Sequence, residues 1–316
     1  MHGCWLTSTI FSLLLATSVR AAQEGEPAAS NLSAVTVVHD GEPPHRKLEY
    51  KFANGQFAHY EVTSKMTMTT QHGQAQVKAV NESQAWKMFR VVTVDANGHA
   101  TLEPLIERVK MQAQIDNLPP TTYDSQLDPA PPREFAEVAK SIGRAHARFL
   151  YSRDGELLKI ITLPGAPPYL TAAAEKVDAK YSFLVPLPKT PVGVGAVWKD
   201  RFQVMVTVGE GLGQPVTLQR QFTWKSQDGS VATLLSKTSV LSPINNPQVE
   251  GQLMQRTPSA VIKFDLERGL VLSQTASVDQ EVVNALGPNT RLHAQSETVE
   301  RLIPTPAGVQ PAALKQ

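Results

Sequence analysis

Alternation of apolar and polar side chains is the dominant pattern in the middle of the chain. From residue 60, one side of the pattern carries Tyr60, Val62, Ser64, Met66 and Met68, and the other carries Glu61, Thr63, Lys65, Thr67 and Thr69. A period of two is typical of a β-strand with one buried face. Similar runs begin near Trp86, Trp198 and Val216, so we expect several long, half-buried strands.

The run near Trp86 is less regular than the others. Its apolar positions are Trp86, Met88, Val92 and Val94, with Arg90 as an exception. We expect this set to form the buried face of its strand. Together with Met66 and Met68, the pair Trp86 and Met88 is then a candidate lining for an apolar groove, because methionine adapts to varied ligands. The alternative is ordinary core.

Turn signals separate the strand runs. They are the pairs Asn54-Gly55, His72-Gly73, Asn97-Gly98, Asp154-Gly155 and Asp228-Gly229. Such pairs tolerate the positive φ angles of tight hairpins. One-sided alternation with short turns indicates antiparallel sheet. The fold class predicted is therefore mainly β with minor α.

Two segments have helical spacing. In residues 133–147, Phe135, Val138 and Ile142 recur at intervals of three and four, and in residues 169–183 a stripe runs through Tyr169 and Tyr181. A proline pair precedes each segment, where its missing N–H is tolerated. We expect both helices to cover a sheet face near the middle of the chain.

Strand-turn-strand phrases occur twice, in the same order. Residues 88–102 resemble 221–235, and F-L-Y-S-R-D-G-E-L-L at 149–158 resembles I-K-F-D-L-E-R-G-L-V at 262–271. We predict two diverged copies of one curved, antiparallel unit, at residues 46–165 with one helix and 166–303 with the other. A long period means two domains or two halves of one.

The two ends of the chain differ from this core. Residues 5–19 are apolar and precede Val19-Arg20-Ala21, which is typical of a secretory signal peptide over residues 1–21 with cleavage near Ala21. A membrane anchor is the alternative, but the run is shorter than the roughly 20 residues of a span. Residues 22–45 are predicted to be a flexible lead-in and 304–316 a disordered tail.

Charge and cysteine content exclude several classes of function. Removing Arg20 with the leader leaves 29 basic residues against 29 acidic ones. The sequence therefore lacks the excess of basic residues that is typical of nucleic-acid-binding proteins. Cys4 is the only cysteine, and it falls inside the leader. A processed chain would therefore have no disulfide, no thiolate nucleophile and no cysteine metal site.

Several phrases resemble a family of exported bacterial proteins of unknown function. They are L-E-Y-K-F-A-N-G-Q-F near the start, T-Y-D-S, P-L-P-K-T-P-V-G-V-G-A-V-W at the midpoint and F-D-L-E-R-G near the end. The resemblance covers most of the chain outside the leader and implies a secreted or envelope β-protein without an assigned activity. More distantly, the units are similar to the curved half-barrel sheets of bacterial lipoprotein carriers, a likeness of fold alone.

Motifs that carry chemistry are missing. The sequence has no G-x-S-x-G turn and no H-E-x-x-H pair, and the loop histidines His39 and His45 are the nearest approach to a metal pair. Asp124 and Ser125 form the most suggestive polar pair, although an aspartate in a turn usually bonds to its own backbone. We therefore assign no catalytic, cofactor-binding or metal-binding residue and expect no cofactor.

The leading hypothesis is an exported, non-enzymatic protein. It would bind a lipid, another apolar ligand or an envelope protein through a concave sheet face, without nucleic acid and without stable membrane insertion after cleavage. One alternative is a periplasmic or secreted hydrolase whose site is assembled in space from Asp124 and a histidine. Another is a structural or protein-interaction module of the envelope.

Overall fold

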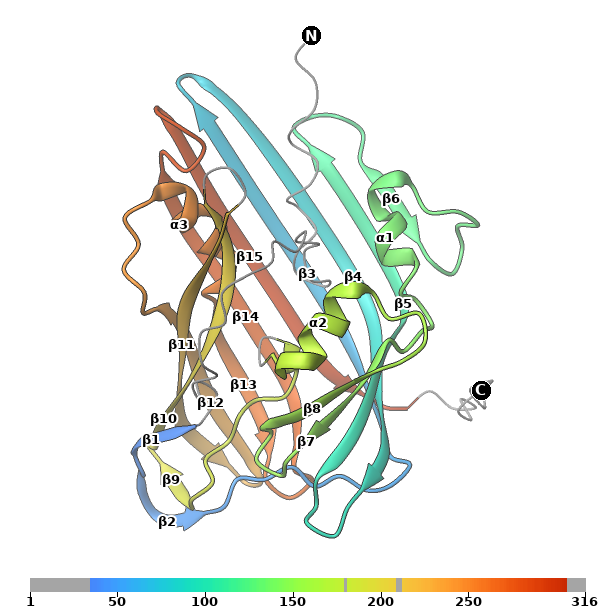
Figure 1. The fold of residues 1–316 in the computed structure, drawn as a ribbon, viewed down its shortest axis with the longest axis vertical. Coiled ribbons are helices and arrows are strands. Elements are labelled where there is room, and N and C mark those ends of the chain that lie inside the picture. Colours follow the sequence, from blue (N-terminus) through green and yellow to red (C-terminus); the bar gives the residue numbers. More distant parts are fainter. Residues whose placement is uncertain (1–34, 179–180, 209–211, 306–316) are drawn as a thin grey trace.

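One large antiparallel sheet of 13 strands dominates the computed structural model, which describes residues 35–178, 181–208 and 212–305 (Figure 1). Its neighbouring strands are, in order, β1 (Thr36–His39), β10 (Val197–Val208), β11 (Leu212–Asp228), β12 (Val231–Val240), β13 (Ser259–Asp265), β14 (Leu270–Val283), β15 (Thr290–Ile303), β3 (Phe57–His72), β4 (Ala75–Val94), β5 (Ala100–Ile115), β7 (Ala147–Tyr151) and β8 (Leu157–Thr162). In addition, β6 (Thr121–Asp124) pairs with β5, and β2 (Glu42–Arg46) pairs with β9 (Val192–Val194) in a separate small sheet. The mainly β prediction is confirmed.

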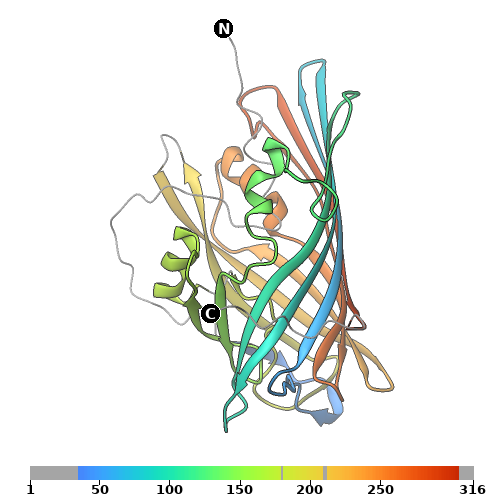
Figure 2. The same ribbon diagram turned by 90° about the vertical axis from the view of Figure 1, so that its right-hand side faces the viewer.

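The sheet is curved and open. Its edge strands β1 and β8 do not pair with each other, and the remaining strands wrap around a concave side (Figures 1 and 2). Side chains alternate between the two faces, so cross-strand partners share a face. The buried side chains Tyr60, Leu218 and Phe264 face the concave side, which therefore holds the apolar cores.

The five predicted Asn-Gly, His-Gly and Asp-Gly turns are confirmed. Each of their glycines has a positive φ angle, from 55° at Gly229 to 78° at Gly155. These turns join strands that are neighbours in the sheet or lead into them, as the short connections of an antiparallel meander require.

The helices are shorter than predicted. The segment predicted at 133–147 forms only the 3-10 turn η1 (Arg133–Phe135) and α1 (Ala136–Ala139). Gly143 then adopts a φ of 71° and its N–H donates to the carbonyl oxygen of Ile106 at 2.8 Å, which ends any helix. The prediction for residues 140–147 was therefore wrong, and the chain enters β7 at residue 147.

The second predicted helix also ends early, and a third was missed. α2 covers Pro168–Lys176 and stops at Val177, whose φ of 47° is left-handed, so the predicted helix does not continue through the described residues 177–178 and 181–183. α3 (Pro247–Leu253), followed by the 3-10 turn η3 (Met254–Arg256), was not predicted. Its N-cap is Asn246, whose side chain accepts a hydrogen bond from the N–H of Gln248 at 2.9 Å. Within the described residues, no helix has the length and hydrophobicity of a membrane span.

The two halves of the chain have the same strand order. Strands β3-β4-β5-β7-β8 are successive neighbours, and so are β10-β11-β12-β13-β14. The phrases that resemble each other fall at equivalent places in these two series. β15 joins the halves, because it pairs with β14 on one side and with β3 on the other. The shared order is compatible with duplication, which stays a prediction.

The largest core lies at the lower end of the sheet and contains side chains from both halves. Leu102 and Tyr151 from the first half are fully buried in it, together with Trp198 and Phe264 from the second. Such a core does not separate into two hydrophobic units. The two halves therefore pack as parts of one structure.

The phrase L-E-Y-K-F has a structural role within this core. Residues 48–52 run between the β7–β8 turn and the β13–β14 turn. The N–H of Tyr50 donates to the carbonyl oxygen of Arg153 at 2.7 Å, and the N–H of Lys51 donates to that of Gly269 at 3.3 Å. The Tyr50 hydroxyl also donates to the carbonyl oxygen of Val185 at 3.1 Å. The two similar turns thus hold one segment between them.

Residues 36–46 contain β1 and β2, so that part of the predicted flexible lead-in is ordered by pairing with β10 and β9. The buried face of β4 carries Phe89 and Val91, so predicting Trp86 and Met88 on it was wrong. The signal peptide and residues 22–34 lie outside the described residues, as does the tail from residue 306.

Candidate functional site: the concave face of the sheet

Six small side chains form one row across the middle of the concave face. The register places Ser236 opposite Ala260, Ala260 opposite Ala276, and so on through Thr298 and Ser64 to Ser83. We call these six residues the small-residue row. The row crosses β12, β13, β14, β15, β3 and β4, and five strand spacings of about 4.8 Å give it a length of about 24 Å.

All six side chains of the row are half-buried. Within the row, the hydroxyl oxygens of Ser64 and Thr298 lie 2.9 Å apart and form a hydrogen bond across the strands. Alanine, serine and threonine extend only a short distance from the sheet. The row therefore forms a shallow floor between larger side chains, with partly accessible atoms along its length.

Apolar side chains border the row on both sides. Leu234 and Ile262, one level below on β12 and β13, belong to the large lower core. Met66 and Val278, one level above on β3 and β14, are buried. Other positions on the same two levels are polar: Gln274 and Glu300 lie below the row on β14 and β15, and Ser296 and Asn81 lie above it on β15 and β4.

The helical segments cover the ends and the upper part of the concave face (Figure 2). Phe135 and Val138 of the η1–α1 segment pack on Val62, Ala85 and Val109. On the opposite side, Val249 and Leu253 of α3 pack on Val204, Val206, Val216 and Leu218. Each helical segment therefore covers its own apolar cluster, and the small-residue row lies between those clusters.

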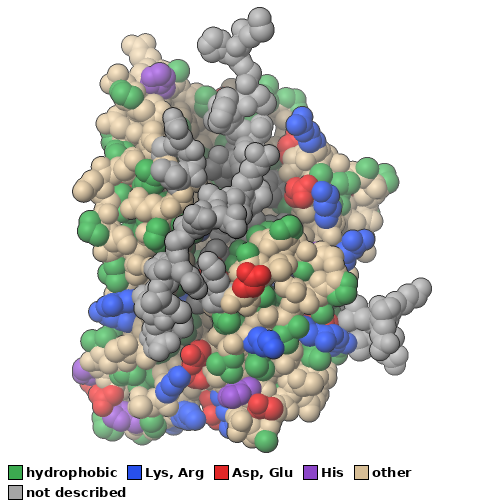
Figure 3. Space-filling view, viewed as in Figure 1, with side chains coloured by type: hydrophobic (Ala, Val, Ile, Leu, Met, Phe, Trp, Pro, Cys, Tyr) green, Lys and Arg blue, Asp and Glu red, His purple; other side chains and the backbone are tan. Residues whose placement is uncertain are grey.

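The charged groups on the concave face are mostly paired. Lys87 and Glu300 form an ion pair at 2.8 Å. Arg220 binds the buried carboxylate of Asp200, with Nε and Oδ1 3.0 Å apart, and its guanidinium lies 5.0 Å from the centre of the Phe202 ring. Within each pair, the positive and the negative side chain neutralise each other. On the α3 side, the upper left of Figure 3 shows mainly hydrophobic and uncharged side chains.

Met66 and Met68 lie on the concave face as predicted, whereas Trp86 and Met88 do not. Trp86 faces the convex side opposite Glu61, and Met88 faces it opposite His59. The Trp86 ring contacts cations instead of a groove, with the Arg108 guanidinium 4.9 Å from its centre. The predicted groove lining of four residues is therefore reduced to two.

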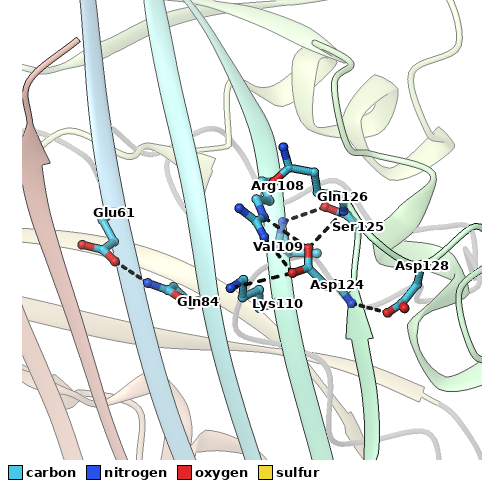
Figure 4. A network of polar contacts seen from close by, with 9 residues as sticks. All are labelled: Glu61, Gln84, Arg108, Val109, Lys110, Asp124, Ser125, Gln126 and Asp128. Atoms are coloured by element: carbon cyan, nitrogen blue, oxygen red, sulfur yellow. Dashed lines mark hydrogen bonds and ion pairs between the residues drawn. The ribbon is translucent and has the colours of Figure 1, made fainter. Parts of the chain in front are cut away.

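Asp124 belongs to an ion-pair network on the convex face (Figure 4). Its carboxylate accepts from Arg108, with Nη2 and Oδ2 2.7 Å apart, and lies 3.7 Å from the Lys110 ammonium. It also accepts from the backbone N–H of Gln126 at 3.0 Å, the local turn bond expected of such an aspartate. The Arg108 hydrogen bond holds the pKa of the Asp124 carboxyl below its ordinary value.

Ser125 has a structural contact as well. Its hydroxyl oxygen accepts from the N–H of Val109 at 3.0 Å, which ties the end of β6 to β5. Asp124 and Ser125 thus fasten a short edge strand to the sheet. Asp124 and Arg108 thus form an ion pair with a structural role.

The structure does not bring Asp124 to a histidine. Among the described residues, its side-chain partners are the two cations and the backbone donor given above. Three histidines bond to other carboxylates: His59 to Glu107, His99 to Asp95 and His293 to Asp279. His39 and His45 both bond to Gly41, and the described residues contain no cluster of metal ligands.

Comparisons with known proteins give only weak likenesses. No protein-family model matches the chain, and no curated protein matches it by sequence. Among solved structures, lipovitellin, described for its lipid–protein interactions, has 14% identity and a TM-score of 0.47 over 84% of this chain. This chain spans 27% of that lipovitellin chain.

Two bacterial structures show weaker likenesses. DynF from the dynemicin biosynthesis pathway of Micromonospora chersina has 9% identity, covers 89% of this chain and 94% of its own, and gives a TM-score of 0.23. A DUF1329 family protein from Desulfovibrio piger has 10% identity, with 77% and 83% covered and a TM-score of 0.13. None of these TM-scores reaches 0.5, so function has to be argued from the residues of this chain.

Proposed function

We propose that this protein is an exported, non-enzymatic carrier or sensor that binds a molecule with a long apolar chain along the small-residue row. The observation that carries the proposal is the half-buried state of all six row residues on a concave face whose other apolar parts are covered by helices. Export and an envelope location are part of the proposal and rest on the leader-like first 21 residues.

The dimensions and chemistry of the row fit an extended chain. Its length of about 24 Å is comparable to that of a long acyl chain. Small side chains leave room above the sheet, and the six half-buried row residues offer their atoms to a ligand, whereas the neighbouring Met66, Val278, Leu234 and Ile262 are buried in the protein itself. Burying apolar surface is worth about 25 cal/mol per Å², so contact along such a row favours a chain over a compact polar ligand.

The alternatives from the sequence gain little support. The hydrolase hypothesis relied on Asp124 and a histidine, and the structure pairs Asp124 with Arg108 instead. A purely structural or protein-interaction role is favoured by a concave face that its own helices fill. The half-buried row argues for a ligand in that position.

A tryptophan placed in the row tests the proposal. Ala276→Trp would fill the centre of the floor, whereas Ser277→Trp places the same ring one residue away on the exposed convex face. Binding of cis-parinaric acid is followed by its fluorescence, with urea unfolding as a check on folding. We expect Ala276→Trp to weaken binding at least about tenfold and Ser277→Trp to leave it unchanged.

Two results would count against the proposal. One is a wild-type protein that does not bind the fatty acid. The other is equal binding by the two tryptophan variants, which would place the ligand elsewhere.

A further inference from the structure

Arg256 is close in sequence to the small-residue row. It is the last residue of η3, four residues before Ala260 of the row. η3 is fixed on the concave side by two contacts. Met254 is buried against Val282, and the Thr257 hydroxyl oxygen accepts from the Gln280 side-chain amide at 2.7 Å. The position of the Arg256 backbone is therefore set by the fold.

Arg256 differs from the other half-buried arginines in its lack of an acidic partner. The other four, each bonded to a carboxylate, are Arg90, Arg108, Arg148 and Arg220. Arg256 makes no ion pair and no side-chain hydrogen bond with any described residue. Burial lowers its pKa, and Tyr181 opposes that shift. A partly desolvated cation without a partner is unfavourable unless a ligand supplies the opposite charge.

Two tyrosines, one in α2 and one after it, form a ring pair, and one of them interacts with Arg256. Tyr169 of α2 and Tyr181 have stacked rings 6.2 Å apart, and Tyr181 and Arg256 act on each other electrostatically. Burial raises the pKa of both hydroxyls, which therefore stay protonated. The carboxylate of Asp178 also acts on Tyr181 and contributes to the raised pKa of its hydroxyl.

We infer that Arg256 binds the anionic head of the ligand, a carboxylate or a phosphate. This inference rests on the proposed function, since the head is that of the molecule whose chain follows the row. The planar guanidinium suits both groups, because its paired N–H donors match two oxygens of a carboxylate or phosphate. The ligand class is then an anionic lipid rather than a neutral one.

A pair of probes that differ only in head charge tests the inference. cis-Parinaric acid and its methyl ester share the same chain, and only the acid is anionic at pH 7.5. We expect Arg256→Gln to weaken binding of the acid by about 10- to 100-fold, the loss typical of a charged hydrogen bond, and to leave the ester unchanged. Arg256→Lys should keep part of the affinity for the acid. Arg301→Gln, at an exposed arginine on the convex face, is the control and should bind both probes like the wild type.

The outcomes separate this inference from the proposed function. If the wild type and Arg256→Gln bind the acid equally well, the head site is overturned while the chain site stands. Equal losses for acid and ester would also overturn it, because they indicate a change in the binding of the apolar chain along the small-residue row. If the wild type binds neither probe, both proposals fail. Displacement of the bound acid by lysophosphatidic acid, compared with displacement by oleate, then distinguishes a phosphate head from a carboxylate head.

Discussion

Gly155 and Gly269 stand in equivalent turns of the two halves, and both press against residues 48–52. A β-carbon on Gly155 would lie 2.8 Å from the Tyr50 ring and 2.6 Å from the Val185 carbonyl oxygen. A β-carbon on Gly269 would lie 2.4 Å from the backbone nitrogen of Lys51. The glycines of the two similar phrases are thus required for close packing as well as for turn geometry.

Alanine at either glycine should therefore destabilise the protein strongly. Gly155→Ala and Gly269→Ala each combine strain at positive φ with a clash against backbone, and we expect losses of about 2–4 kcal/mol in the free energy of unfolding. Gly229→Ala is the matched control, because Gly229 has a φ of 55° in an Asp-Gly turn but no atom within 4 Å of its added β-carbon. It should cost about 1 kcal/mol. Equal losses for all three variants in urea unfolding would refute the packing role.

The strands and turns could be predicted from sequence because their signals are local. The alternation over residues 60–69 predicts a strand without knowledge of the strands beside it. The pair Asp154-Gly155 predicts a turn from its own two residues. Strand β4 was misread because apolar residues occupy both of its faces, with Phe89 and Val91 on the buried one. Residues 140–147 share helical spacing with α1, yet Gly143 bonds to β5 instead, a tertiary contact that spacing does not encode.

The candidate site could not be predicted in the same way. The small-residue row joins Ser64 to Thr298, and only the register between β3 and β15 brings them together. In the sequence, Ser64 is a polar residue between Val62 and Met66 on an otherwise apolar face, and this position alone does not indicate a binding site. Arg256 is distinguished by having no acidic side chain as an ion-pair partner among the described residues. The absence of such a partner cannot be predicted from the amino-acid sequence.

The two halves should unfold together. Because Leu102, Tyr151, Trp198 and Phe264 share one core, loss of either half exposes the other. We expect one urea transition, with the same midpoint by far-ultraviolet circular dichroism and by tryptophan fluorescence. Trp86 reports on the first half and Trp198 and Trp224 on the second, so the single variant Trp86→Phe and the double variant Trp198→Phe/Trp224→Phe separate the two signals. Midpoints that differ between these variants by more than their change in stability would indicate two independent domains.

Glu103 should be the most sensitive charged residue of the first half. Its buried carboxylate binds Arg90 at 2.8 Å and Arg148 at 2.7 Å, across β4, β5 and β7. Glu103→Gln keeps the shape but leaves two arginines without their counter-charge. We expect a loss of at least about 2 kcal/mol, at the lower end for a broken buried pair because both arginines are part exposed.

The control for Glu103 is an exposed ion pair. Glu137 binds Lys140 at 2.6 Å with both side chains largely in solvent. Glu137→Gln should leave the free energy of unfolding nearly unchanged. If Glu103→Gln behaves like Glu137→Gln, the three-strand ion cluster does not stabilise the sheet.

Asp124 should contribute to stability in a pH-dependent way. Its pKa is below the ordinary carboxyl value when the protein is folded, chiefly because Arg108 donates to it. The contribution is therefore complete above the unfolded pKa of about 3.9 and is lost as pH falls through the folded value. Measured by urea unfolding from pH 7 to pH 3, the gap between wild type and Asp124→Asn should narrow at the acidic end. A gap that widens on acidification would contradict the role of Asp124 as an ionised partner of Arg108.

The central claim is that the concave face holds a ligand with a long apolar chain. Native mass spectrometry of the protein purified gently from its host, followed by organic extraction, tests this claim most directly. We predict a reproducible extra mass that extracts as an anionic lipid and is lost in Ala276→Trp but kept in Ser277→Trp. A clean apo mass for the wild type, with no gain when a lipid extract of the host is added, would contradict the claim.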